Sequence, residues 1–140
     1  HTSDFQREYR AICVGTPSPV RGVVDRPIGR APDSLLRREV SPSGSPARTA
    51  YEVLESRDAF SLVLLVPFTG RTHQLRVHMA SMGHPLVGDW LYGTEDRRLI
   101  ARPALHAAAL ALRHPMTGQW LRLSAPLPAD MQTLWEGGGS

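Results

Sequence analysis

The segment FTGRTHQLRVHMASMGHPLVGDWLYG, residues 68–93, constrains the fold more than any other part of the chain. Within it, residues 72–82 form an amphipathic stretch. Leu75, Met79 and the last methionine of this stretch fall at the i, i+4 and i+7 spacing of a single helical face. Gly83 stands where a left-handed C-terminal cap belongs, and a proline follows shortly after. The pattern predicts one prominent helix with an apolar stripe.

Most other apolar runs are short and rich in β-branched or aromatic residues, which is typical of strands. Residues 60–68 are nearly continuous in apolar side chains, and we expect this strand to be buried on both faces. Residues 41–46 suit a hairpin loop, and residues 128–135 suit a short terminal helix. The other expected strands are residues 9–14, 23–30, 35–40, 47–56 and 120–123. Together these elements predict an α+β fold, with a mixed or mostly antiparallel sheet and one prominent helix laid against it.

The composition is that of a single soluble domain with a core, because 41% of the 140 residues are hydrophobic and 21% are charged. We assign residues 1–136 to this domain and residues 137–140 to a glycine-rich tail. No apolar run approaches the length of a membrane span. Cys13 is the only cysteine, which excludes a disulfide framework or a thiolate metal cluster within one chain and fits a reducing cytoplasm.

All 16 basic residues are arginine, and the chain has no lysine. One interpretation is a functional preference for guanidinium groups, which fork onto phosphates and stack on bases. The other is a GC-rich genome, in which lysine codons are scarce. The net charge of +3 and the pI near 9.7 agree with an RNA partner without establishing one.

The segment that begins FTGRTHQLR closely resembles the signature in the C-terminal half of the RluA-type pseudouridine synthases. Further motifs follow in the family's order: Pro27-Ile28-Gly29-Arg30, then Ala47, Thr49 and Tyr51, then Leu105-His106-Ala107, His114-Pro115 and Ala125-Pro126. The resemblance covers nearly the whole chain, from about Tyr9 to Asp130. It also favours a strand for residues 104–113, where alanine content favours a helix but length and flanking residues favour a strand.

The resemblance implies an RNA pseudouridine synthase, which isomerises uridine in structured RNA such as rRNA or tRNA without a cofactor or metal. It implies that Arg76 pairs with the catalytic aspartate and that Leu75 lies under the active site. It also implies that Tyr9 stacks on the target uracil and is the favoured candidate for the C5 proton, although its pKa of about 10 would have to be effectively lowered. Without the resemblance, these positions would be a surface arginine, a core leucine and a packing tyrosine.

The residues that open the helix form a candidate RNA-phosphate site through their backbone N–H groups, the Thr72 hydroxyl and Arg71. Ordinary N-capping by Thr69 or Thr72 is a compatible alternative. The predicted RNA-binding residues are Gly70, Arg71, Thr72, His73 and Gln74.

Histidines in the same segment invite a metal interpretation, which we reject. His73 and His78 are five residues apart and do not share a helix face, and no carboxylate or cysteine completes a ligand set. His73 and Arg76, by contrast, can face one side of the helix, opposite the Leu75 stripe. We expect Asp89 to pack the turn after the helix.

The family's catalytic aspartate lies in an H-R-L-D-x-x-T-S-G segment that this sequence does not contain. Asp4 is a poor substitute, because no T-S-G follows it and it lies only five residues before Tyr9. We therefore expect the C-terminal half of a longer enzyme, inert alone, with an open edge strand where the N-terminal half belongs. The alternatives are a non-catalytic RNA-binding module and a scaffold without activity of its own.

Overall fold

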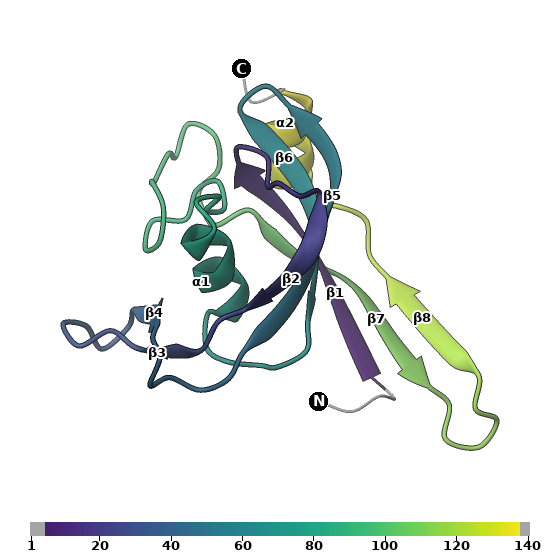
Figure 1. The fold of residues 1–140 in the computed structure, drawn as a ribbon. Coiled ribbons are helices and arrows are strands. Elements are labelled where there is room, and N and C mark those ends of the chain that lie inside the picture. The colour runs from purple at the N-terminus through teal and green to yellow at the C-terminus, as the bar shows by residue number, and fades with distance from the viewer. Residues whose placement is uncertain (1–4, 138–140) are drawn as a thin grey trace.

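A computed structural model describes residues 5–137, and its main element is a six-stranded antiparallel sheet in the order β2-β5-β6-β1-β7-β8 (Figure 1). Its strands are β1 (Phe5–Val14), β2 (Arg21–Asp25), β5 (Arg48–Arg57), β6 (Phe60–Pro67), β7 (Leu105–Arg113) and β8 (Trp120–Ser124). A small second sheet pairs β3 (Ile28–Arg30) with β4 (Arg38–Val40), and the helices are α1 (Gln74–Ser81) and α2 (Ala129–Glu136). The predicted α+β class is confirmed. Asp4 and the last three residues of the predicted tail lie outside the described residues.

The main sheet is a middle layer between the two helices (Figure 1). Successive side chains of a strand point to opposite faces. Accordingly Ala11 and Cys13 of β1 pack in one core with Leu75 and Met79 of α1, whereas Ile12 packs in a second core with residues of α2. The apolar stripe predicted for the helix is therefore confirmed as its contact with the sheet.

Strand β6 departs from the prediction of burial on both faces. Val63 and Leu65, which face α1, are fully buried, but Leu62 and Leu64 on the other face are only half-buried. Leu62 packs against the core that includes α2, whereas Leu64 lines an open groove. The continuous apolar run predicts burial on both faces, whereas α2 covers only one end of the second face.

The expected strand over residues 23–30 is two strands that belong to different sheets. Pro27, which has no backbone N–H to donate to a ladder, lies at the break. The predicted hairpin loop at residues 41–46 is also wrong, because β4 pairs with β3 and β5 pairs with β2 and β6. Instead Ser45 exchanges backbone hydrogen bonds of 2.9 and 2.8 Å with Ile28. The β3–β4 hairpin is thereby held beside α1 (Figure 1).

The two ends of α1 are built differently. At the C-terminus Gly83 has φ 86°, its N–H donates to the carbonyl of Ala80, and the next N–H donates to Met79, which is the expected left-handed cap. At the N-terminus the cap is His73 at φ 57°, with no side-chain capping bond, so the threonine caps expected from the sequence are wrong. The helices described between residues 5 and 137 include none long and apolar enough to cross a membrane.

Candidate active site

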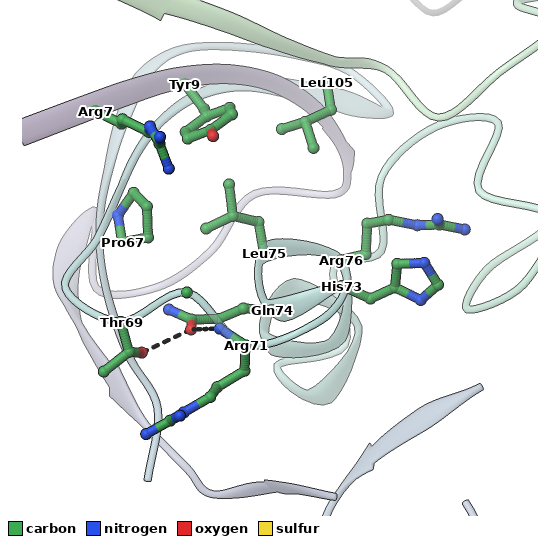
Figure 2. Close-up of a pocket in the computed structure, with 11 residues that line it drawn as sticks. Arg7, Tyr9, Pro67, Thr69, Arg71, His73, Gln74, Leu75, Arg76 and Leu105 are labelled. Atoms are coloured by element: carbon green, nitrogen blue, oxygen red, sulfur yellow. Dashed lines mark hydrogen bonds between the residues drawn. The ribbon is translucent and has the colours of Figure 1, made fainter. Parts of the chain in front are cut away.

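A cleft of about 310 Å³ lies between β1 and the start of α1, and we call it the β1–α1 cleft. Figure 2 shows Tyr9 and Leu105 on one side of it and Leu75 pointing toward them from α1, with His73 and Arg76 side by side on the helix. Of the eight site residues predicted from sequence, seven line this cleft: Tyr9, Gly70, Arg71, His73, Gln74, Leu75 and Arg76. Thr72 lines a neighbouring cavity instead.

Tyr9 reaches the cleft from the face of β1 that packs on α1. Its strand register against β7 shifts at this point, because Glu8 pairs with Ala109 whereas Tyr9 pairs with Ala107. Such a bulge increases the local twist and re-aims neighbouring side chains. The Tyr9 ring packs against the core that contains Leu75, so one face of the cleft is apolar and suited to a flat base.

Arg76 forms a bidentate ion pair with Asp89, with Nε–Oδ2 and Nη2–Oδ1 distances of 2.9 Å each. The Asp89 side chain is fully buried, and its Oδ1 also accepts the backbone N–H groups of Leu91 and Tyr92. Charge-assisted forks of this kind fix both partners. The sequence assigned Asp89 only to packing the turn, whereas the structure shows that it orients Arg76. Among residues 5–137, Nη1 of Arg76 makes no hydrogen bond.

The loop that carries Asp89 depends on Gly88, which has φ 79°. A Cβ atom at this position would lie 2.5 Å from the carbonyl oxygen of Arg102. Farther along the loop lie Trp90 and Tyr92. Their ring centres are 5.8 Å and 5.1 Å, respectively, from the Arg76 guanidinium. The loop therefore supplies a carboxylate and two aromatic faces to one arginine.

His73 lies beside Arg76, as the i+3 spacing predicted, and both contact Tyr92. The Tyr92 hydroxyl oxygen accepts the backbone N–H of Arg38 at 2.9 Å and lies 2.7 Å from Nδ1 of His73. The hydroxyl proton is free to be donated to Nδ1, an arrangement in which the ring proton of a neutral His73 sits on Nε2. Burial and the nearby Arg76 lower the pKa of His73, which favours this neutral ring.

The Gln74 side chain is buried and uses both of its polar atoms. Its Oε1 accepts the Thr69 hydroxyl at 2.6 Å and the Arg71 backbone N–H at 3.1 Å, and its Nε2 donates to the Arg48 carbonyl and the Thr49 hydroxyl at 2.9 Å each. This explains why Thr69 does not cap α1. Gln74 thus fixes the turn at residues 69–71 from beneath, and its side chain is not displayed on the surface.

His78 belongs to the same buried network. Its Nε2 lies 2.8 Å from the Arg26 carbonyl, which can only accept, so Nε2 carries the proton and Nδ1 accepts the Thr49 hydroxyl at 2.8 Å. Burial lowers the pKa of His78. Both ring nitrogens of His78 therefore have structural partners.

Sequence reasoning missed several residues of the site. Tyr92 follows Asp89 by three residues and was not singled out, although it contacts both His73 and Arg76. Leu105 belongs to a family-like motif, and its position in the cleft could have been suspected from that signal. The other unpredicted lining residues are Arg7, Pro67 and Thr69.

The chain is similar to known proteins of one family. The RNA pseudouridylate synthase family matches residues 1–81. An RNA pseudouridine synthase of Chloroflexus aurantiacus, named as uncharacterized, is 48% identical over 129 residues, which cover 91% of this chain and 40% of the relative. The ribosomal large subunit pseudouridine synthase D of Escherichia coli is 40% identical over 146 residues, which cover 95% of this chain and 44% of the relative.

Among solved structures, human RNA Pseudouridylate Synthase Domain Containing 1 superimposes with a TM-score of 0.75 at 32% identity, covering 88% of this chain and 55% of the human one. The chain therefore belongs to the RNA pseudouridylate synthase family, of the RluA type. It spans less than half the length of these curated relatives.

Proposed function

We propose that this chain forms part of an enzyme that isomerises uridine to pseudouridine in structured RNA, with rRNA or tRNA as the substrate, in the cytoplasm. The observation that carries the proposal is the β1–α1 cleft, which gathers Tyr9, Leu75 and Arg76 beside the turn at residues 70–74. These segments are far apart in the sequence, and one cleft of 310 Å³ is of the size that takes a single flipped base.

Each residue has a role that its surroundings support. Tyr9 would stack on the uracil and is the candidate for taking the C5 proton, while Leu75 forms the apolar floor across from it. Gly70 and Arg71 would hold RNA phosphate at the entrance, with Gln74 positioning their turn. The reaction breaks the bond from N1 to the ribose and joins C5 to the same carbon, so it is redox-neutral and requires no cofactor or metal.

Arg76 would orient the catalytic aspartate, which the family carries in a segment that this sequence does not contain. Asp89 occupies Nε and Nη2 and holds the guanidinium plane fixed. The remaining Nη1 can donate to a second carboxylate. We therefore infer that the 140-residue chain alone binds RNA without converting it.

The rest of the catalytic domain is the partner we propose, packed on the β7–β8 side of the sheet. An apolar groove of about 360 Å³ lies there, and Tyr9 lines both this groove and the β1–α1 cleft. A segment packed in the groove would thus lie next to the cleft. Leu123, at 63% exposure, is among the apolar side chains that such a segment would cover.

A non-catalytic RNA-binding module is the second candidate, favoured by the absence of the H-R-L-D-x-x-T-S-G segment from the sequence. It predicts salt-sensitive RNA affinity in which Arg71→Ala weakens binding and Arg76→Ala is neutral. The enzyme predicts that Arg76→Ala abolishes pseudouridine formation by the protein that the gene encodes in full.

The test is an assay of tritium release from RNA labelled at uracil C5. We expect RNA binding and no release by the 140-residue chain, and release by the full gene product that Tyr9→Phe strongly reduces. Turnover by the chain alone would show that the sequence holds its own nucleophile. Absence of turnover by the full product on both rRNA and tRNA would favour the binding module.

A further inference from the structure

A second cavity, of about 350 Å³, lies beside the β1–α1 cleft, between the β3–β4 hairpin and the turn before α1. Three arginines line it: Arg30 in β3, Arg38 in β4 and Arg71 in the turn. We call these residues and the space between them the arginine cleft. None of its eight lining residues is acidic.

Two of the arginines repel each other in a fixed geometry. Arg30 and Arg38 are directly opposite in the antiparallel β3–β4 pair. Side chains at opposed positions share a face of the sheet, and like charges there are unfavourable. Neither guanidinium forms an ion pair with any residue in the described range 5–137. The register therefore puts two arginines that lack an ion-pair partner on one face of the hairpin, lining the same cavity.

The guanidinium of Arg38 has an unmet hydrogen-bonding requirement. Its Nη1 atom is buried and has no hydrogen-bond partner, a costly state for a polar group that is removed from water. Arg71, in contrast, is anchored through Nε to the Pro46 carbonyl at 2.8 Å. This bond fixes the plane of the Arg71 guanidinium and leaves its two terminal nitrogens for another acceptor.

These features call for an anion with several acceptor oxygens. A phosphate group meets the requirement, because the guanidinium fork matches its geometry and a tetrahedral anion can accept from several donors at once. The Thr72 hydroxyl offers a further donor at the same cavity. Gly70 and Arg71 line both this cavity and the β1–α1 cleft, so the two are contiguous.

We propose that the arginine cleft binds a phosphate of the RNA backbone next to the nucleotide held in the β1–α1 cleft. The identification of the phosphate as part of RNA rests on the proposed function. The proposal assigns RNA contacts to Arg30 and Arg38 of the hairpin, which extends the phosphate site beyond the turn at residues 70–74.

The first test uses inorganic phosphate, titrated into the isotope-labelled chain while the backbone amide signals of Gly29 and Thr72 are followed by NMR. The variants are Arg30→Gln and Arg38→Gln, with Arg37→Gln as the matched control. Arg37 is the adjacent residue, loses the same charge, lies outside the arginine cleft and is placed near Asp33 at 4.0 Å. Arg30 is exposed, so its variant reports on the site even if Arg38→Gln disturbs the hairpin.

We expect phosphate to shift both signals in the wild-type chain and in Arg37→Gln, and the shifts to be lost in Arg30→Gln and Arg38→Gln. Equal loss in all three variants would show a diffuse charge effect and overturn the proposal. So would the absence of any shift in the wild-type chain.

The second test measures the affinity for a fluorescent uridine-containing stem-loop RNA across a salt series. Each lost phosphate contact lowers the slope of log K against log salt by about one. We expect this reduction in Arg30→Gln and Arg38→Gln and not in Arg37→Gln. Equal slopes in all variants would overturn the proposal that the arginine cleft binds an RNA phosphate, while leaving the proposed function intact. Phosphate binding without any RNA binding would overturn the RNA assignment and with it the proposed function.

Discussion

The residues around α1 and those at the β7–β8 end of the sheet differ in burial and in side-chain pairing. Around α1, the buried carboxylate of Asp89 and the side chains of Gln74 and His78 all have hydrogen-bond partners. In β8, every residue from Trp120 to Ser124 is exposed, and Leu121 and Leu123 are among the large apolar side chains that face solvent. Figure 1 shows β7 and β8 extending away from the layers that α1 and α2 cover.

These polar side chains around α1 find their partners within this chain, whereas the apolar side chains of β8 are left exposed. Buried polar groups are costly unless each one is paired, so the network around α1 can persist only as a unit. An exposed apolar edge strand is an aggregation hazard that folded proteins normally cover or charge. The contrast shows that the polar contacts of Asp89, Gln74 and His78 around α1 are complete within the chain, and it supports the proposal that another part of the catalytic domain packs on the β8 side.

The largest effect should come from breaking the Arg76–Asp89 pair. Asp89→Ala leaves a largely buried guanidinium uncompensated, and we expect it to lower the free energy of unfolding by ~3–5 kcal/mol. Urea denaturation measures the change. The control is Glu95→Ala, which removes one partner of the exposed Arg97 pair and should cost less than ~1 kcal/mol. Similar losses in both variants would mean that the α1 network is no more cooperative than the surface.

Truncating one apolar side chain in each region should lower the free energy of unfolding by less than the loss of Asp89. The loss should be larger near α1 than on β8. Met79 is fully buried under α1, and Met79→Ala should cost ~2–5 kcal/mol. Leu123 is 63% exposed on β8, and Leu123→Ala should change stability by less than ~0.5 kcal/mol. Equal losses in the same urea series would show that the β8 surface is covered in solution, for example by a second copy of the chain.

Acidification should weaken the α1 side through its histidines. Burial lowers the pKa of both His73 and His78 in the folded chain relative to the ordinary value of 6.5. The unfolded chain then binds more protons than the folded one just below pH 6.5, so stability must fall as the pH is lowered through that value. Unfolding curves between pH 8 and 5 should show this decline, and His73→Gln should remove its part. A stability that rises on acidification over this range would contradict the lowered pKa values of the two histidines.

The smallest expected signal concerns Cys13, which is fully buried in the α1-facing core with a pKa raised by burial to about 12. A thiol in that state is unreactive, so a thiol reagent should label the native chain only through unfolding. Leu123→Cys provides the matched control, because its added thiol lies on exposed β8 and should react at once. Rapid labelling of the wild-type chain would show that the α1-facing core opens readily.

The sequence predicted the parts of the fold that depend on local periodicity. The stripe through Leu75 and Met79, the cap at Gly83 and the terminal helix were all visible as spacing or as single-residue chemistry. The split between β2 and β3 and the pairing of β4 with β3 were not, because strand partners are chosen by contacts between distant residues. The two-sided burial expected for β6 failed for the same reason.

The site shows a similar limit. The sequence predicts eight site residues, and seven of them line one cleft. Helical spacing alone could not have placed Tyr9 there, because Tyr9 lies on a strand far from α1 in the sequence. The pairing of Arg76 with Asp89, the role of Tyr92 and the left-handed cap at His73 all depend on how the loop after α1 folds back. The charge clustering at Arg30 and Arg38 appears only once β3 and β4 are in register.

The most direct test of the central claim compares tritium release from uracil C5-labelled RNA by the full gene product, by its Arg76→Gln variant and by the 140-residue chain. We expect release by the full product, with pseudouridine formed, and none by the variant or by the chain alone. Release by the chain alone, or undiminished release by Arg76→Gln, would contradict that claim.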